Sequence, residues 1–416
     1  MSQQDLLFNS LEKPIPGIRG NLDIIPVQES GKSYLYFHDM MGYATPNFAL
    51  ERSAGQILSL FNGQRSINEL SEYLDDDVSV DQFLQYIRFL DKNRLLYSEF
   101  YKTYSNKIET EYEQKSERTP TSSGLSYPAD PHELKEQFDQ AFNEHEVPVS
   151  LNGRKVKALY APHIDPRVGF SSYVKAFAPL RNLKPKRVVV IATSHYSGLY
   201  PDTYDNQPFI LSDKTFQLPH GDVPSDQQAV QELIDKADEL GISGNDRAHR
   251  IEHSIELHLV FLKYLWDHDF SMVPILVGSF GDLLYKRDGH LGKQLDQLST
   301  HLRNKYADDD ETLFLISGDL AHIGKKFGDP KAANTMFEEV KAFDKKFMRF
   351  ARDASHENIL DLMRDTLDPY RICGFPPLYT FLNAFPDLKG QQLSYDLWDE
   401  SERESAVTFG SLLYTK

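Results

Sequence analysis

The most regular pattern in the chain is a set of short apolar runs that each end in a small polar turn. Residues 188–191 are all β-branched, and similar runs lie at 156–161, 272–277 and 312–316. They lack the apolar and polar alternation of a half-buried strand, and are typical of strands buried on both faces of a parallel sheet. We therefore predict four strands of one sheet, the second of them spanning 187–192.

Segments with helical spacing of apolar residues alternate with these runs. Such alternation predicts an α/β domain, a sheet flanked by helices, over residues 125–416. Residues 199–224 are rich in proline and glycine and are expected to be an irregular insertion that edges a pocket. The predicted helices span residues 171–180, 226–238, 253–265, 286–304 and 331–352.

A separate small module is predicted over residues 1–100. Alternating residues indicate a short strand at 34–38, and apolar spacing predicts a helix over 49–61. Capping boxes at Ser66 and Ser79 open two further helices, the first with Leu74 among its inward residues. A turn into a strand at 93–97 completes the order of a winged-helix module.

Residues 101–124 are polar, poor in aliphatic side chains, and end in serine, threonine and proline. This composition predicts a flexible linker between the two domains.

Charge and cysteine content narrow the function classes. The net charge of −17 disfavours nucleic acid and anionic membrane surfaces as partners. With Cys373 as the single cysteine, no intramolecular disulfide can form, and a reducing compartment is the simpler expectation. No apolar run has the length of a membrane span, so a cytoplasmic protein is expected.

Histidines follow three of the predicted strands. His163 and His195 come directly after two of them, and Asp319 and His322 follow a third. The carboxyl ends of parallel strands meet at one edge of a sheet, where α/β proteins place their chemistry. Asp319 either caps a helix or orients the imidazole of His322 for acid/base work.

Cys373 lies in a tight turn before an apolar helix. A helix start lowers the pKa of a thiol and favours the metal-binding thiolate, although a lone cysteine is also a common core residue. Together with two imidazoles it would leave coordination positions open, as catalytic metals require. This donor set suits iron, copper or zinc, and softness alone does not choose among them.

The segment from Glu252 to His258 contains two histidines and two glutamates but does not match the zinc-protease motif HExxH. Its histidines are five residues apart and lie on different faces of a helix. Glu252, His253 and Glu256 are either pocket residues or part of a solvated helix start.

Six segments, taken in order, resemble the Memo family, protein B of the AmmeMemoRadiSam trio. They are APHIDPRVGFSSYVKAF, VVVIATSHYSG, EHSIELHLVFL, VPILVGSF, LISGDLAHIG and ICGFPPLYTFLNAF. The resemblance covers residues 125–416 and implies a fold similar to class III extradiol dioxygenases. The sequence departs from the family pattern at Ile164 and Asp165, which follow His163, and at Tyr196, which follows His195.

The resemblance also implies roles for particular residues. It places the metal ligands on His163, His195 and Cys373, and the acid/base or pocket residues of the family on Asp319, His322, Glu252 and His253. A redox enzyme with iron or copper acting on an unidentified small molecule is then expected. The alternatives are a non-catalytic metal-binding or scaffold protein and, third, a zinc hydrolase.

The N-terminal module resembles the PqqD-like peptide-recognition domains. This resemblance implies binding of a peptide or a partner protein, such as a radical S-adenosylmethionine enzyme of the same trio. A structural appendage is the alternative. Winged helices also bind DNA, but residues 51–100 hold nine acidic and five basic residues, which disfavours phosphate binding.

Overall fold

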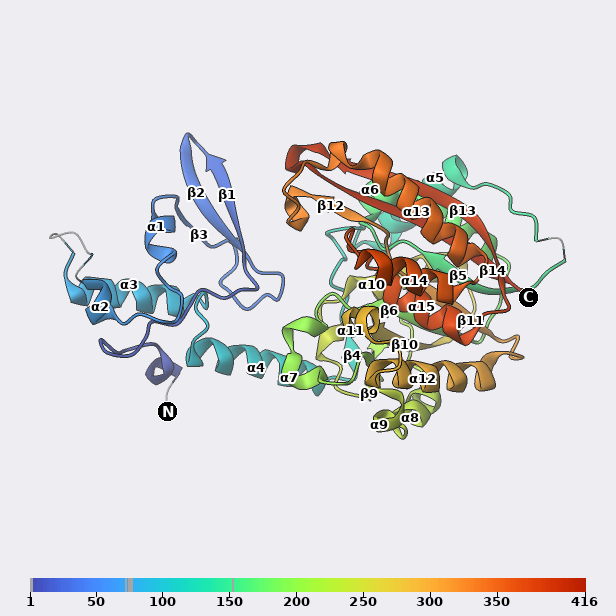
Figure 1. The fold of residues 1–416 in the computed structure, drawn as a ribbon, viewed down its shortest axis with the longest axis horizontal. Helices are drawn as coiled ribbons and strands as arrows, with labels where there is room; N and C mark the ends of the chain where they lie inside the picture. Colours follow the sequence, from blue (N-terminus) through green and yellow to red (C-terminus); the bar gives the residue numbers. More distant parts are fainter. Residues whose placement is uncertain (1–2, 72, 74–77, 152) are drawn as a thin grey trace. The chain divides into compact units, whose positions relative to one another are not determined.

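The chain divides into two compact units, Met1–Gln114 and Lys115–Lys416. The computed structural model describes residues 3–71, 73, 78–151 and 153–416. Figure 1 shows the order of the helices and strands in both units.

The N-terminal unit contains a three-stranded antiparallel sheet in the order β1-β2-β3. Ser30 and Gly31 join β1 to β2, and both have positive φ angles, as a two-residue hairpin turn requires. β2 confirms the strand predicted at 34–38. The elements of this unit are β1 (Asp23–Glu29), β2 (Lys32–His38), β3 (Ala49–Glu51), α1 (Ala54–Leu58), α2 (Ile67–Ser71), α3 (Val80–Lys92) and α4 (Glu99–Glu113).

Two predictions for this unit are wrong in part. The helix predicted over 49–61 is short, because residues 49–51 pair with β2 as a third strand. In place of the strand predicted at 93–97, Leu96 forms an isolated bridge with Ile18. The capping boxes that open α2 and α3 are present, while Leu74 lies outside the described residues.

The predicted linker 101–124 is wrong over most of its length. Helix α4 continues to Glu113, with Tyr101, Glu109 and Tyr112 on its buried face. The buried positions are two tyrosines and one glutamate, so the composition hid an amphipathic helix. Arg118, farther along, is fully buried within the second unit.

A nine-stranded sheet forms the centre of the second unit. Its middle strands run parallel in the order β5-β11-β6-β10, and antiparallel strands flank them. The strands are β5 (Val156–Ala161), β6 (Arg187–Thr193), β7 (Phe209–Leu211), β9 (Ile242–Ser243), β10 (Ser271–Val277), β11 (Thr312–Ser317), β12 (His322–Gly324), β13 (Lys389–Glu400) and β14 (Ser405–Thr415). A separate short pair joins β4 (Glu117–Arg118) and β8 (Thr215–Phe216).

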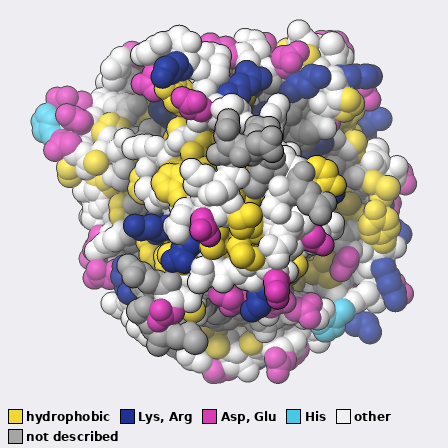
Figure 2. Space-filling model, turned by 90° about the vertical axis from the view of Figure 1, so that its left-hand side faces the viewer, with side chains coloured by type: hydrophobic (Ala, Val, Ile, Leu, Met, Phe, Trp, Pro, Cys, Tyr) yellow, Lys and Arg dark blue, Asp and Glu magenta, His cyan; other side chains and the backbone are white. Residues whose placement is uncertain are grey.

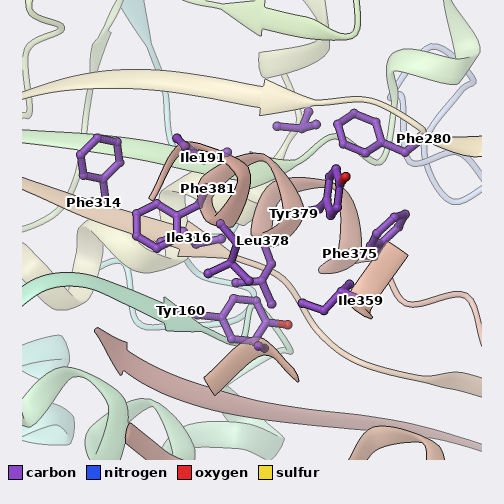
Figure 3. Close-up of a cluster of buried hydrophobic side chains, with 14 of the residues drawn as sticks. Tyr160, Ile191, Phe280, Phe314, Ile316, Ile359, Phe375, Leu378, Tyr379 and Phe381 are labelled. Atoms are coloured by element: carbon purple, nitrogen blue, oxygen red, sulfur yellow. The ribbon is translucent and has the colours of Figure 1, made fainter. Parts of the chain in front are cut away.

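Helices cover both faces of this sheet, which explains the continuous apolar runs. In β6, Val189 and Ile191 enter one hydrophobic core and Val188 and Val190 enter the other. Figure 3 shows the first core, where side chains of α15 pack against β5, β6 and β11. The helices are α5 (Pro131–His145), α6 (Pro166–Phe177), α7 (Pro201–Tyr204), α8 (Gln227–Ile234), α9 (Ala237–Leu240), α10 (His253–Leu265), α11 (Gly281–Tyr285), α12 (His290–Tyr306), α13 (Phe337–Arg352), α14 (His356–Thr366) and α15 (Phe375–Ala384).

The structure thus confirms a mixed α/β fold with a large sheet flanked by helices. The predicted strands agree with β5, β6, β10 and β11 to within a residue at each end, and α10 has the predicted bounds. The insertion 199–224 is less irregular than predicted, since β7 within it pairs with β10. The hairpin β13-β14 had no counterpart among the predicted elements.

The distribution of surface charge and the apolar character of the helices bear on which partners the protein can have. Figure 2 shows acidic, basic and hydrophobic side chains interspersed over one face of the molecule, so on this face the negative net charge is not gathered in one patch. Among the described residues, no helix combines the length and apolar character needed to cross a membrane.

Candidate metal centre

The fold brings together residues from five separate parts of the chain. His163, His195 and Asp319 each lie two residues beyond the end of β5, β6 or β11, which are neighbours in the sheet. His253 begins α10, and Cys373 precedes α15. The donor atoms of these five residues form two groups that share His163, and within each group they lie within 4.8 Å of one another.

His163 is held as the tautomer that a metal ligand needs. Its side chain is 2% exposed, and its Nδ1 lies 3.1 Å from the hydroxyl of Ser317. That hydroxyl donates its one hydrogen to the carbonyl of Ser254, so it accepts from Nδ1–H. Nε2 therefore carries the free lone pair, and it lies 3.2 Å from Sγ of Cys373.

The turn that carries His163 is fixed from two sides. His258 donates from Nε2 to the carbonyl of Pro162 at 2.7 Å. Oδ1 of Asp319 accepts the backbone N–H groups of His163 and Ile164. No helix begins at Asp319, so the predicted alternative of a helix cap is wrong. Burial raises the pKa of this carboxyl to about 7, although the two N–H groups oppose the shift.

Glu252 fixes the backbone and the imidazole of His195. It is the N-cap of α10, and its side chain is 1% exposed. It accepts both the backbone N–H and Nδ1–H of His195, at 2.7 and 2.9 Å. Burial alone would raise the pKa of Glu252, but the adjacent His195 lowers it to about 2. Because Glu252 binds Nδ1, Nε2 of His195 is the nitrogen left for Cys373 or for a metal ion.

His253 lies beside His195. The two rings stack 4.8 Å apart at 17°, and Nδ1 of His253 is 3.5 Å from Oε1 of Glu252. Burial lowers the pKa of His253 to about 4. The predicted pocket residues Glu252 and His253 are therefore part of the cluster, while Glu256 has another role, described below.

Close backbone packing places Cys373. A Cβ on Gly318 would lie 2.2 Å from Cα of Gly374, so only glycine permits this approach. The hydroxyl of Thr193 donates to the carbonyl of Cys373 at 2.7 Å. Burial raises the pKa of the Cys373 thiol, opposed in part by His195, so the predicted lowering at a helix start is wrong. A bound cation would reverse this effect.

His322 lies outside both donor groups. Its Nδ1–H points at the carbonyls of Leu320 and Arg371, and its backbone N–H donates to the carbonyl of Tyr370. Burial lowers the pKa of His322 to about 4. These bonds hold the loop before Cys373, in which Arg371 has a φ of 54°.

A cavity of about 960 Å³ opens beside the cluster. Its lining includes His195, Cys373 and aromatic side chains such as Phe280 and Phe375. A small molecule in this cavity would meet His195 and Cys373 directly.

A buried ion pair that sequence reasoning missed supports α10. Arg118 donates to Glu256 at 2.7 Å, and both side chains are fully buried. Arg118 also donates to the carbonyls of His249 and Glu252. Nothing local marks Arg118 in the sequence, because its partners on Glu256, His249 and Glu252 lie more than 130 residues away. The contact of Ser317 with His163 was not predicted either, although Ser317 directly precedes Gly318 and Asp319 in the segment LISGDLAHIG.

Fold and site together define a mixed α/β protein with histidines, a cysteine and carboxylates gathered at the ends of parallel strands. Residues 118–413 match the model of the Memo-like protein family, and the chain belongs to this family.

Three relatives illustrate the range of the similarity. A MEMO1 family protein of Aquifex aeolicus is 28% identical over 86% of this chain and 90% of its own length. One of Thermus thermophilus is 28% identical over 73% and 85%. Protein MEMO1 of Homo sapiens is 24% identical over 67% and 88%. The first alignment spans more residues than 115–416 contains, so that similarity reaches into the N-terminal unit.

Proposed function

We propose that the protein is a metal-dependent redox enzyme whose iron or copper ion is held by His163, His195 and Cys373. The observation that carries the proposal is the fixed tautomer of His163, whose unprotonated Nε2 faces the thiol of Cys373 at 3.2 Å. A hydrogen-bond network that keeps an imidazole nitrogen free beside a thiol is typical of metal ligands.

The donor set fits such an ion. Two imidazoles and one thiolate leave coordination positions open, as in catalytic rather than structural sites. Mixed nitrogen and sulfur donors suit iron, copper and zinc, and the first two support redox chemistry. His195 and Cys373 also line the cavity, which gives a substrate access to the same point.

When bound, the ion would supply Lewis acidity and one-electron chemistry. The residues around it do the positioning. Glu252 orients His195 through Nδ1, and Asp319 holds the turn of His163 through two backbone N–H groups. His322 donates its Nδ1–H to carbonyls and keeps Nε2 as an acceptor for a proton. A kinship of the fold with extradiol dioxygenases belongs to this proposal and rests on the sequence resemblance.

Metal analysis of protein purified without oxygen tests the proposal. We expect near-stoichiometric iron or copper in the wild type, and a lower metal content in both Cys373→Ala and His195→Ala. His290→Ala is the matched control, because His290 lines the cavity outside both donor groups. Loaded protein is then screened for oxygen consumption. Stoichiometric zinc without oxygen consumption would favour a hydrolase, and a wild type that takes up neither iron nor copper would favour the scaffold alternative.

For the N-terminal unit we propose peptide or protein binding, with the radical S-adenosylmethionine enzyme of the trio as the partner. The support is the sequence resemblance together with the edge strand β1, on which Ile24 is 40% exposed. Titration of the full chain with that purified enzyme tests it. Ile24→Asp should weaken binding and Val168→Asp, an equally exposed position in the second unit, should not. Equal binding by both variants would exclude β1 as the contact.

A further inference from the structure

The cluster holds more donors than the three ligands of the proposed function. One group joins His163, His195 and His253, and the other joins His163, Asp319 and Cys373. His253 is thus as close to the two predicted histidine ligands as a ligand has to be. A three-imidazole group is itself a common binding site for first-row transition metals.

Glu252 gives His195 and His253 the same orientation. Its Oε1 lies 2.9 Å from Nδ1 of His195 and 3.5 Å from Nδ1 of His253. The rings stack at 17°, so with both Nδ1 atoms toward one oxygen their Nε2 atoms lie on the side away from Glu252. One carboxylate therefore prepares two imidazoles to donate a nitrogen lone pair to a cation.

His163, two residues beyond the end of β5, completes the group. Its ring centroid lies 4.9 Å from that of His195 and 5.4 Å from that of His253, and its plane is steeply inclined to both. Its Nδ1–H is bound to Ser317, so its free nitrogen is also Nε2.

Access differs among the three imidazoles. The side chain of His163 is 2% exposed, whereas those of His195 and His253 are 28% and 31% exposed. A cation can therefore reach the two partly exposed imidazoles first and then the buried one. Cys373 lies against the free nitrogen of His163, with Sγ 3.2 Å from Nε2, and Oδ2 of Asp319 is 3.8 Å from the same atom.

We propose that His253 is a metal ligand, and that the imidazoles of His163, His195 and His253 hold a divalent first-row transition ion even when the thiol of Cys373 is removed. The inference rests on the proposed function for the presence of a metal, but assigns a ligand which that function does not include. Because His163 offers a single free nitrogen, the two donor groups share one ion. Loss of the thiol then weakens binding instead of abolishing it.

Cobalt(II) titration of the full-length, metal-free protein tests this inference, with absorption as the readout. The wild type should bind one Co²⁺ and show a near-ultraviolet band from thiolate-to-cobalt charge transfer. Cys373→Ser should lose this band, keep the visible cobalt bands, and bind with an affinity lowered by less than about 100-fold. Cys373→Ser/His253→Ala should be weaker by at least a further factor of about 100, more than the loss of a supporting contact costs.

Controls separate the failure modes. His290→Ala should titrate like the wild type, and tryptophan fluorescence during urea unfolding checks that each variant folds. If the alanine variant is unfolded, Cys373→Ser/His253→Gln keeps the bulk of the side chain and gives the same comparison. Equal affinities of Cys373→Ser and the double variant, with the charge-transfer band present in the wild type, would overturn the ligand role of His253 and leave the proposed function standing. No cobalt binding by the wild type would overturn both.

Discussion

Replacing Arg118 with methionine should destabilise the second unit and the helix that supports the cluster. The guanidinium donates to the carboxylate of Glu256 and to the carbonyls of His249 and Glu252, with no exposed surface. Methionine keeps much of the volume but removes these bonds. Glu256 would then retain its bonds from the backbone of residues 121 and 122 and from Tyr127, without a balancing charge.

The size of the effect follows from the burial of both partners. Breaking a buried ion pair from one side costs about 3 to 5 kcal/mol, because an uncompensated charge remains. Burial alone would raise the pKa of Glu256. In the wild type, Arg118 and the hydrogen bonds outweigh burial and hold this pKa below its ordinary value. Without Arg118 that pKa should rise, so the loss in Arg118→Met should be larger at pH 8 than at pH 5. Arg118→Met/Glu256→Gln leaves no unpaired buried charge at this pair, so this variant should be no less stable than Arg118→Met.

Urea unfolding of the full chain measures these free energies. Both tryptophans, Trp266 and Trp398, lie in the second unit, so their fluorescence reports on that unit alone. Arg167→Met is the matched control, since Arg167 forms an exposed ion pair whose loss should cost below about 1 kcal/mol. A loss of less than 1 kcal/mol in Arg118→Met, or a double variant less stable than it, would refute the reasoning.

Three further predictions concern the cluster and its support. Gly374→Ala places a Cβ 2.3 Å from a buried tyrosine hydroxyl and should abolish the cobalt charge-transfer band; Gly198→Ala, with open space around it, should keep the band. Ser317→Ala removes the acceptor of Nδ1–H of His163 and should weaken Co²⁺ binding by about 10- to 100-fold, and an unchanged affinity would contradict the tautomer assignment. Burial lowers the pKa of Lys157 to about 8. Between pH 8 and 10.5 the unfolded chain therefore binds a proton that the folded chain has lost. The stability of the wild type relative to Lys157→Met should rise by up to about 3 kcal/mol over this range. A flat difference over this range in urea unfolding would contradict that pKa.

Much of the second unit was predictable because its strands are buried on both faces. Continuous apolar runs such as 188–191 mark such strands without reference to any partner, and the ends of these strands locate His163 and His195. The hairpin β13-β14 escaped prediction. In β13 only Ser394 is buried, so the strand lacks the pattern of its neighbours.

Composition was a poor guide where polar residues are buried. Residues 101–124 read as a linker, yet Glu109 is buried on α4 and Arg118 is buried against Glu256. A buried polar side chain has the same letter as an exposed one. Only its partner, remote in the sequence, distinguishes the two.

The sequence by itself determined the α/β class, the four central strands and the residues that follow them, because local periodicity depends on near neighbours. It identified the candidate metal ligands but not their tautomers or protonation states. The tertiary structure decided that His163 and Cys373, 210 residues apart, lie in contact and that Ser317 and Glu252 set the imidazole tautomers. It also decided that burial raises the pKa of Cys373. Proton positions and burial depend on atoms that only packing brings together, so no local pattern encodes them.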